Sequence, residues 1–273
     1  MEHLIVHEYR IPIKGVKQKI LYHFSDVHLS LDDALSTPEE RERAQQKTQS
    51  WREERMQFAR HHGEACGEEH QLEATEHLEH LLAAAEADGD ALVIAGDLFD
   101  YVSPANVRAF EQRFSRLSVP YVYVCGNHEP RRAIPDESAM AVIKQPVQTL
   151  DLGDMLLVGF DDSERAITDH QLDALRDLLA QDKPLILAMH IPIQIEQNPD
   201  HKACDDYFRL NHQGAPAQNL AFIELIRQNP DKIAAVLTGH LHFLNRCELA
   251  PGLTQYVSSQ GVLGNLNRYV IGE

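Results

Sequence analysis

The sequence predicts an α/β fold, and two features of its pattern support this prediction. Short apolar runs rich in β-branched residues recur along the chain, as expected of buried strands. Segments with the 3.6-residue periodicity of amphipathic helices lie between these runs. Strands that alternate with helices are typical of a sheet with helices on both faces. The chain has 273 residues, 43% of them hydrophobic, which is enough for one substantial core.

Five of the apolar runs are expected to form the central strands. They are KILYHF at 19–24, ALVIA at 91–95, VPYVYV at 119–124, PLILAM at 184–189 and IAAVLT at 233–238. The predicted helices occupy 70–88, 104–117, 168–181 and 218–228. Four further runs, separated by proline and glycine turns, predict either a second sheet or an extension of the first. These runs lie at 155–160, 245–249, 254–259 and 267–271.

Residues 32–90 interrupt the alternation of strands and helices. They hold 16 acidic residues against 6 basic ones, and their apolar residues are thinly spaced as far as residue 62. This composition predicts a charged helical insertion on the surface, between the first two central strands. Residues 1–273 are therefore expected to form a single domain with an insertion at about 32–90. The insertion is expected to act as a lid, a specificity element or a contact that forms a homo-oligomer.

Composition and charge narrow the classes of function. The formal net charge is −17, and an acidic surface disfavours broad binding to the nucleic-acid backbone. The N-terminal run MEHLIVHEYRIPIKG carries charges and has no small-residue cleavage site, so no secretory signal is predicted. No apolar run approaches the length of a membrane span. The four cysteines lie far apart without a CxxC pair, which favours reduced thiols and a cytoplasmic location.

Each of the five predicted central strands leads directly into side chains of the metal-binding type. The residues concerned are Asp26 and His28, Asp97 and Asp100, Asn127 and His128, His190, and His240 and His242. Any one of these short patterns alone is more often a capped turn or a hydrogen-bonded histidine than a set of ligands. Five of them in order indicate one site, because the carboxyl ends of strands line the crevice where α/β proteins bind ligands.

The patterns D-x-H, G-D-x-x-D, G-N-H-E, H and G-H-x-H, in this order over residues 26–242, resemble those of the calcineurin-like metallophosphoesterases. The resemblance implies a layered sandwich of two mixed β-sheets flanked by helices, and a pair of metal ions. It implies that Asp26, His28 and His242 hold one metal, that Asn127, His190 and His240 hold the other, and that Asp97 bridges both. Imidazole, carboxylate and amide ligands together suit Mn²⁺, Fe²⁺, Fe³⁺ or Zn²⁺.

The resemblance also implies a mechanism. A hydroxide that bridges the two metals attacks phosphorus directly, and no phosphorylated enzyme forms. His128 is the histidine that stays off the metals and donates a proton or a hydrogen bond to the leaving oxygen. Asp100 holds His128 in the required tautomer.

Substrate contacts are expected from two further segments. Arg131 and Arg132 directly follow the third motif, where they either clamp a substrate phosphate or form a solvated pair of charges. Residues 197–219 form a long connection after His190 and are expected to wall the substrate pocket. The candidate contacts in that connection are Tyr207, Phe208, Arg209 and His212.

These features predict a metal-dependent phosphoric ester hydrolase that acts on a phosphodiester or phosphomonoester of small or medium size. A repair-type nuclease of the same superfamily is the alternative, because the patterns at 96–100 and 126–129 also resemble blocks of such nucleases. The acidic insertion and the lack of a basic stripe weigh against a nucleic-acid partner. A non-catalytic scaffold that binds proteins is a third hypothesis, and the complete ligand set opposes it. No membrane partner is predicted.

Overall fold

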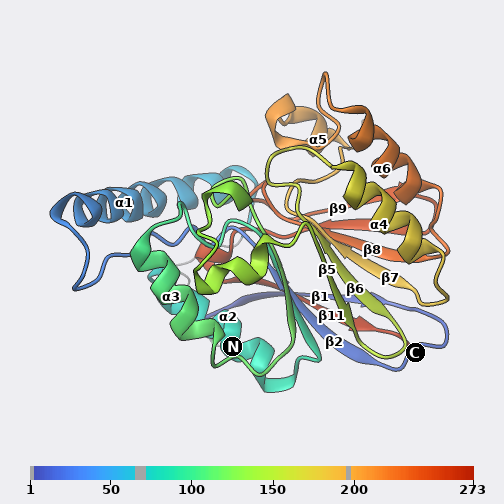
Figure 1. Cartoon of the computed structure of the whole chain (residues 1–273), viewed down its shortest axis with the longest axis horizontal. Coiled ribbons are helices and arrows are strands. Elements are labelled where there is room, and N and C mark those ends of the chain that lie inside the picture. The colour runs from blue at the N-terminus through green and yellow to red at the C-terminus, as the bar shows by residue number, and fades with distance from the viewer. Residues whose placement is uncertain (1–2, 65–71, 195–197) are drawn as a thin grey trace.

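Two β-sheets form the centre of the protein (Figure 1). The structure is a computed structural model and describes residues 3–64, 72–194 and 198–273. The first sheet has the strand order β1-β11-β2-β3-β4 and the second has the order β5-β6-β7-β8-β10-β9. Both sheets are mixed, because β11 runs antiparallel to β2, β5 to β6 and β9 to β10, whereas the other neighbours are parallel.

The strands have the following bounds. The first sheet consists of β1 (Ile5–Ile11), β11 (Asn265–Ile271), β2 (Lys19–Phe24), β3 (Ala91–Ala95) and β4 (Tyr121–Val124). The second consists of β5 (Val147–Asp151), β6 (Leu156–Phe160), β7 (Leu185–Ala188), β8 (Ile233–Thr238), β10 (Leu253–Val257) and β9 (Asn245–Ala250).

Four helices cover the outer faces of the two sheets. They are α2 (Ala74–Asp88) and α3 (Pro104–Phe114) on the first sheet, and α4 (Asp169–Leu179) and α6 (Ala217–Arg227) on the second. Figure 1 shows the first pair at the lower left and the second pair at the upper right, with the sheets between them. The short helices are α5 (Pro199–Ala203), η2 (Arg131–Ala133), η3 (Ala139–Lys144), η4 (Asp206–Phe208) and η5 (Gly261–Leu263).

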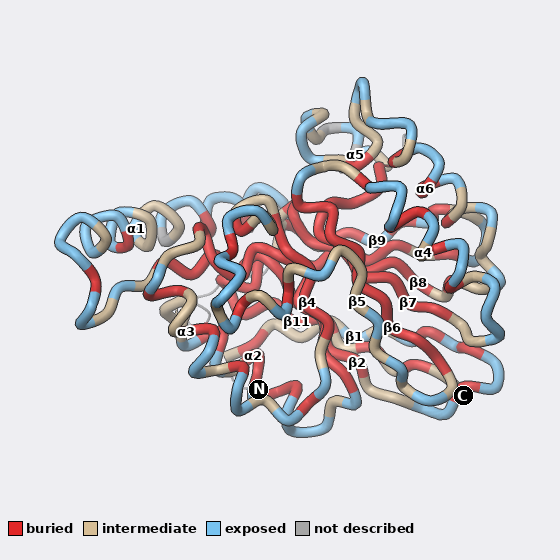
Figure 2. The backbone as a smooth tube through the Cα atoms, in the orientation of Figure 1, coloured by how far each residue is buried: buried red, intermediate tan, exposed pale blue. Residues whose placement is uncertain are grey.

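Alternating side chains of the strands pack into two different layers. On β2, Phe24 faces the helices of the first sheet, whereas Leu21 packs between the sheets. That inner layer also contains Leu157 and Ile186 of the second sheet. Both faces of the central strands are therefore apolar, and the burial map shows these strands as the most buried part of the backbone (Figure 2).

Helix α1 (Pro38–His61) begins the insertion and extends from the body of the protein (Figure 1). Its N-terminus is fixed by a capping box between Thr37 and Glu40, with a proline in the first turn. Most of the helix is exposed, but Ala59 is buried against Val262 and Leu263 of η5. The end of α1 therefore packs on η5, the segment that leads into β11.

The predicted strands and helices agree with these elements, and the two mixed sheets flanked by helices confirm the fold that the resemblance implies. The expectation of one sheet with helices on both faces is wrong. A strand buried on both faces has the same apolar pattern whether its second face meets helices or another sheet. Strands β1 and β5 were not predicted, because both are half-exposed edge strands. Within the described residues, no helix combines the length and apolar character that crossing a bilayer requires.

Candidate metal centre

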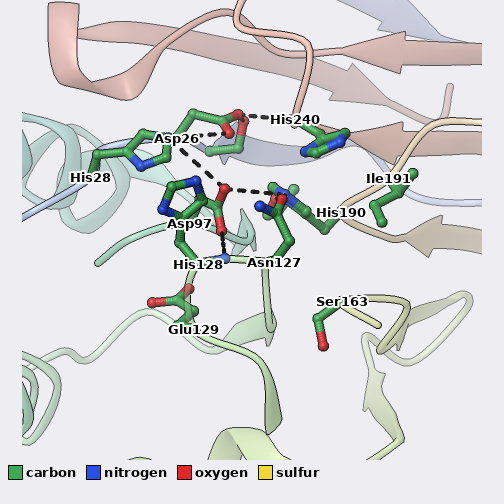
Figure 3. A network of polar contacts seen from close by, with 12 residues as sticks. Asp26, His28, Asp97, Asn127, His128, Glu129, Ser163, His190, Ile191 and His240 are labelled. Carbon is green, nitrogen blue, oxygen red and sulfur yellow. Dashed lines mark hydrogen bonds and ion pairs between the residues drawn. The ribbon is translucent and has the colours of Figure 1, made fainter. Parts of the chain in front are cut away.

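The polar side chains that follow β2, β3, β4, β7 and β8 meet at one place, although these strands belong to two sheets (Figure 3). The carboxyl ends of the parallel strands of both sheets point to the same side of the molecule, so the loops that leave them converge. The loops after β2 and β3 run alongside each other. The backbone N–H of Asp26 donates to the carbonyl of Gly96 (3.1 Å), and that of His28 donates to the carbonyl of Asp97 (3.0 Å).

Backbone groups orient both buried carboxylates. Asp26 accepts a hydrogen bond at Oδ2 from the backbone N–H of His240 (2.9 Å), and Asp97 accepts one at Oδ1 from that of His128 (2.9 Å). The second oxygen of each carboxylate is left to face the imidazoles. Oδ2 of Asp97 lies 3.3 Å from Nε2 of His190 and 3.9 Å from Nε2 of His28, so it stands between two groups of candidate ligands.

The first group consists of Asp26, His28 and His242, whose ligand atoms all lie within 4.8 Å of one another. Nε2 of His242 is 3.3 Å from Oδ1 of Asp26 and 3.0 Å from Nε2 of His28. Oδ1 of Asp26 is buried and has no hydrogen-bond donor among the described residues. An oxygen and two imidazole nitrogens that converge in this way can hold one cation.

The second group consists of Asp97, His190 and His240, with Asn127 beside them. Nδ1 of His190 donates to the carbonyl of Ala95 (2.7 Å), which fixes the ring so that Nε2 faces Oδ1 of Asn127 (3.0 Å). Nε2 of His240 is buried and has no hydrogen-bond partner among the described residues. A metal ion would satisfy this nitrogen, and the residues present therefore fit a metal pair with Asp97 shared between the two positions.

The backbone of the site is constrained at five of the expected ligands. Asp26, His28, Asp97, His240 and His242 all have φ between 50° and 73°, in the left-handed region that residues other than glycine rarely occupy. Two glycines pack directly against ligands. A Cβ at Gly96 would lie 2.4 Å from Nδ1 of His190, and one at Gly126 would lie 2.0 Å from Oδ1 of Asp97.

The charges of the site shift the pKa values of its histidines in opposite directions. Burial opposes protonation of His190, but the charge of Asp97 and the hydrogen bond to it raise the pKa to about 10. Burial likewise opposes protonation of His28, but its interactions with Asp100 and Asp26 raise the pKa to about 9. Burial, followed by the charge of His190, lowers the pKa of His240 to about 3. Without metals, the site therefore holds protons on His28 and His190, whereas His240 is neutral.

His128 and Asp100 form a pair beside the metal ligands. Nδ1 of His128 lies 2.9 Å from Oδ1 of Asp100, and the side chain of His128 is 32% exposed, whereas that of Asp100 is buried. The pKa of Asp100 lies well below its usual range, because the hydrogen bonds from His128 and His28 outweigh the effect of burial. The ligand atoms of His128, His28 and Asp97 lie within 4.8 Å of one another, so the distances alone place His128 close enough to hold a metal as well.

Helix α1 contributes side chains that the sequence did not single out. Nε1–H of Trp51 donates to Oδ1 of Asp100 (2.9 Å), and Nζ of Lys47 lies 3.0 Å from Oδ2 of the same carboxylate. The Trp51 ring stacks on the imidazole of His28 with a centroid distance of 3.9 Å. The one available signal was the single tryptophan of the chain, which stands in an otherwise charged helix.

Two buried carboxyl groups support the loops of the site, and sequence reasoning assigned chemistry to neither. Glu129 accepts hydrogen bonds from the backbone N–H groups of Leu98 (3.1 Å) and Phe99 (2.9 Å), and it thereby fixes the loop that carries Asp97. Burial and the charge of Asp97 raise the pKa of Glu129 to about 7. Asp162 accepts from the backbone N–H groups at residues 190 (2.9 Å) and 191 (3.0 Å), and burial raises its pKa to about 7.

A cleft of about 330 Å³ opens over the candidate ligands. Its described lining includes Asp97, Asn127, His128, His240 and His242 together with Trp51, Glu54, Arg55, Phe58, Tyr207, Phe208, Leu241 and Gln260. Tyr207 and Phe208 come from the connection that was expected to wall the pocket, and their rings lie 5.8 Å and 5.2 Å from that of His240. The cleft has the size of a small-molecule site.

The other expected substrate contacts are not among the described residues that line this cleft. Arg131 lies 3.5 Å from a carboxylate oxygen of Asp161, and Arg132 lies 2.7 Å from one of Glu164. Arg209 pairs with Asp206 and Gln194, and His212 contacts the carbonyl of the residue that follows it. The arginine that does line the cleft is Arg55 of α1.

Comparison with known proteins gives one match by sequence. A family model described as calcineurin-like phosphoesterase matches residues 20–244, from β2 to the residue before β9. Among curated proteins, none matches the sequence. Two of the solved structures that match are as follows. A dimetal phosphatase from Danio rerio has 13% identity and a TM-score of 0.48, over 89% of this chain and 88% of its own. A 5'-nucleotidase from Candida albicans has 12% identity and a TM-score of 0.45, over 92% of this chain and 47% of its own.

Proposed function

Because the chain belongs to the calcineurin-like phosphoesterase family, and is thus a phosphoric ester hydrolase, we propose that it hydrolyses small or medium phosphoesters at a pair of metal ions. Asp26, His28 and His242 would hold one metal, Asn127, His190 and His240 would hold the other, and Asp97 would contribute to both. The observation that carries this proposal is the position of Oδ2 of Asp97 between His190 (3.3 Å) and His28 (3.9 Å). When bound, Mn²⁺, Fe²⁺, Fe³⁺ or Zn²⁺ ions would act as Lewis acids and lower the pKa of a water molecule.

The chain's own residues bind and orient the ester. No serine, threonine or cysteine is among the described residues that line the cleft, which supports direct attack by water. His128 lies in the cleft and stays off the metals, where it gives a proton or a hydrogen bond to the leaving oxygen. Asp100 accepts from Nδ1–H of His128 and fixes the tautomer that leaves Nε2 for this task.

Other expectations stay predictions. Cys125, Cys204 and Cys247 form no disulfide among the described residues, and a cytoplasmic location is retained as a prediction. A homo-oligomer formed through the insertion is also retained as a prediction. No observation in the described part of the structure favours a nuclease or a protein-binding scaffold over a small-molecule hydrolase.

The test is a metal analysis coupled to a substrate panel. Protein loaded with Mn²⁺ is expected to hydrolyse bis(p-nitrophenyl) phosphate, p-nitrophenyl phosphate or both, and the ratio distinguishes a diesterase from a monoesterase. Asp97→Ala is expected to lose metal and activity together, whereas Asp182→Ala, a change at a fully exposed aspartate, should lose neither. Fully metallated protein that cleaves neither ester would refute the proposal. Cleavage of linear DNA at a comparable rate would favour the nuclease.

A further inference from the structure

A second cavity of about 540 Å³ adjoins the cleft over the metal centre. The two cavities share Phe58, Phe208 and Leu241 as lining residues. The ring of Phe58 lies 5.8 Å from that of His242, and the ring of Phe208 lies 5.2 Å from that of His240. One aromatic wall therefore leads from the ligands into this distal cavity, and a group attached to a phosphoryl at the metal centre would enter it.

The walls of the distal cavity combine aromatic faces with negative charge. Phe58 and Phe208 are each 38% exposed, although large apolar side chains are normally covered. Asp200 and Asp205 also line the cavity, and no lysine or arginine does so among the described residues. A second phosphate group would meet two carboxylates there, and the histidines His61 and His62 are the remaining titratable nitrogen groups of the described lining. The cavity is therefore unsuited to the polyphosphate of a dinucleotide or to a nucleic-acid backbone.

A histidine of the wall adds no positive charge near neutral pH. The His62 ring stacks on Phe243 with a centroid distance of 4.2 Å and an interplanar angle of 12°. Burial, followed by the charge of His61, lowers the pKa of His62. His62 thus contributes another aromatic surface rather than a cation.

We infer that the distal cavity binds a positively charged alkylammonium substituent of a phosphodiester whose phosphoryl group lies at the metal centre. Aromatic faces attract a cation through their negative quadrupole, and the carboxylates of Asp200 and Asp205 add Coulombic attraction. This inference rests on the proposed phosphoesterase function, and it specifies which ester the enzyme prefers.

The experiment compares two chromogenic diesters of the same shape. They are p-nitrophenyl phosphorylcholine and p-nitrophenyl 3,3-dimethylbutyl phosphate, in which carbon replaces the quaternary nitrogen. In both, attack of water on phosphorus breaks the bond to the nitrophenyl oxygen and releases p-nitrophenol. We expect kcat/KM to be about tenfold higher for the choline ester. Because both rates come from one preparation, partial loss of folded or metallated protein cancels in their ratio.

Variants assign the preference to the cavity. Asp200→Asn combined with Asp205→Asn, and separately Phe58→Leu, should bring the ratio close to one. Asp182→Asn is the matched control for loss of a negative charge elsewhere, and it should leave the ratio unchanged. Equal rates for the two esters in the parent enzyme, or a faster neutral ester, would overturn the inference while leaving the phosphoesterase function intact. Hydrolysis of neither diester by fully metallated protein would instead count against the proposed function as well.

Discussion

Loading the metal centre at neutral pH should displace protons from two of its histidines. Both ring nitrogens of His190 face oxygen acceptors in the metal-free protein. Nδ1 lies 2.7 Å from the carbonyl of Ala95, and Nε2 lies 3.3 Å from Oδ2 of Asp97. This geometry agrees with a pKa of about 10 for His190, and the pKa of His28 is about 9. A metal requires the neutral imidazole, so binding must remove both protons.

The magnitude follows from these two pKa values. Because both are raised above 7, the metal-free protein holds both protons at neutral pH and loses them only as the pH rises through 9 and 10. Loading two ions at pH 7 should release about two protons from these histidines, in addition to the proton that an ionised metal-bound water gives up. Below pH 9, each fall of one pH unit should weaken the combined affinity for the two ions by about 100-fold, because two protons compete with the metals. His240, with a pKa of about 3, contributes nothing in this range.

Calorimetry measures the release directly. Mn²⁺ is titrated into metal-free protein at pH 7 in two buffers, Pipes and Hepes, that differ in their heats of ionisation. The difference in apparent enthalpy, divided by the difference in the buffers' heats, gives the number of protons. His190→Gln should release about one proton fewer than the parent protein, because His28 is then the only one of these two histidines left to be deprotonated. Equal apparent enthalpies in the two buffers would show that no proton leaves, and would refute the assignment of charge in the metal-free site.

Three further predictions concern the residues around the ligands. His128→Ala should keep both metals, as measured by elemental analysis, and lower kcat by about 10² to 10⁴; loss of metal would show that His128 is a ligand. Trp51→Phe keeps a ring against His28 but removes the donor to Asp100, so kcat should fall about tenfold at unchanged metal content. An unchanged kcat would mean that Trp51 does not orient Asp100. Gly126→Ala places a Cβ 2.0 Å from Oδ1 of Asp97 and should lower the metal content, and full occupancy with normal activity would contradict that expectation.

The sequence predicted those parts of the fold whose signal is local. The central strands β2, β3, β4, β7 and β8 are short apolar runs, and each appears where the pattern placed it. Their division between two sheets depends on which strands pair across the chain, and an apolar run does not encode its partner. The edge strand β1 carries His7, Glu8 and Arg10 among its apolar residues and is half-exposed, so nothing marked it as part of the core.

In the candidate site, too, the sequence predicted the residues that belong to a local pattern and missed those that tertiary packing brings near. The candidate ligands stand directly after strands, so their convergence followed from the fold class. Trp51 and Lys47 reach Asp100 from the first helix of the insertion, and only the docking of that helix brings them near. Arg131 was singled out because it follows a motif, but it lies beside Asp161. Proximity in sequence was a weaker guide to the substrate cleft than the packing of α1.

The left-handed backbone at five candidate ligands limits how this site can evolve. At Asp26, His28, Asp97, His240 and His242 a replacement must tolerate φ between 50° and 73°. Asparagine, aspartate and glycine do so most readily, and histidine is also enriched there, whereas β-branched residues are strongly disfavoured. At these positions, single mutations between aspartate, asparagine and histidine will therefore be tolerated more readily than mutations to other side chains. Those to or from histidine exchange an oxygen ligand for a nitrogen ligand, or the reverse. A change of metal preference should arise most readily at Asn127 and His190, where no such positive φ occurs.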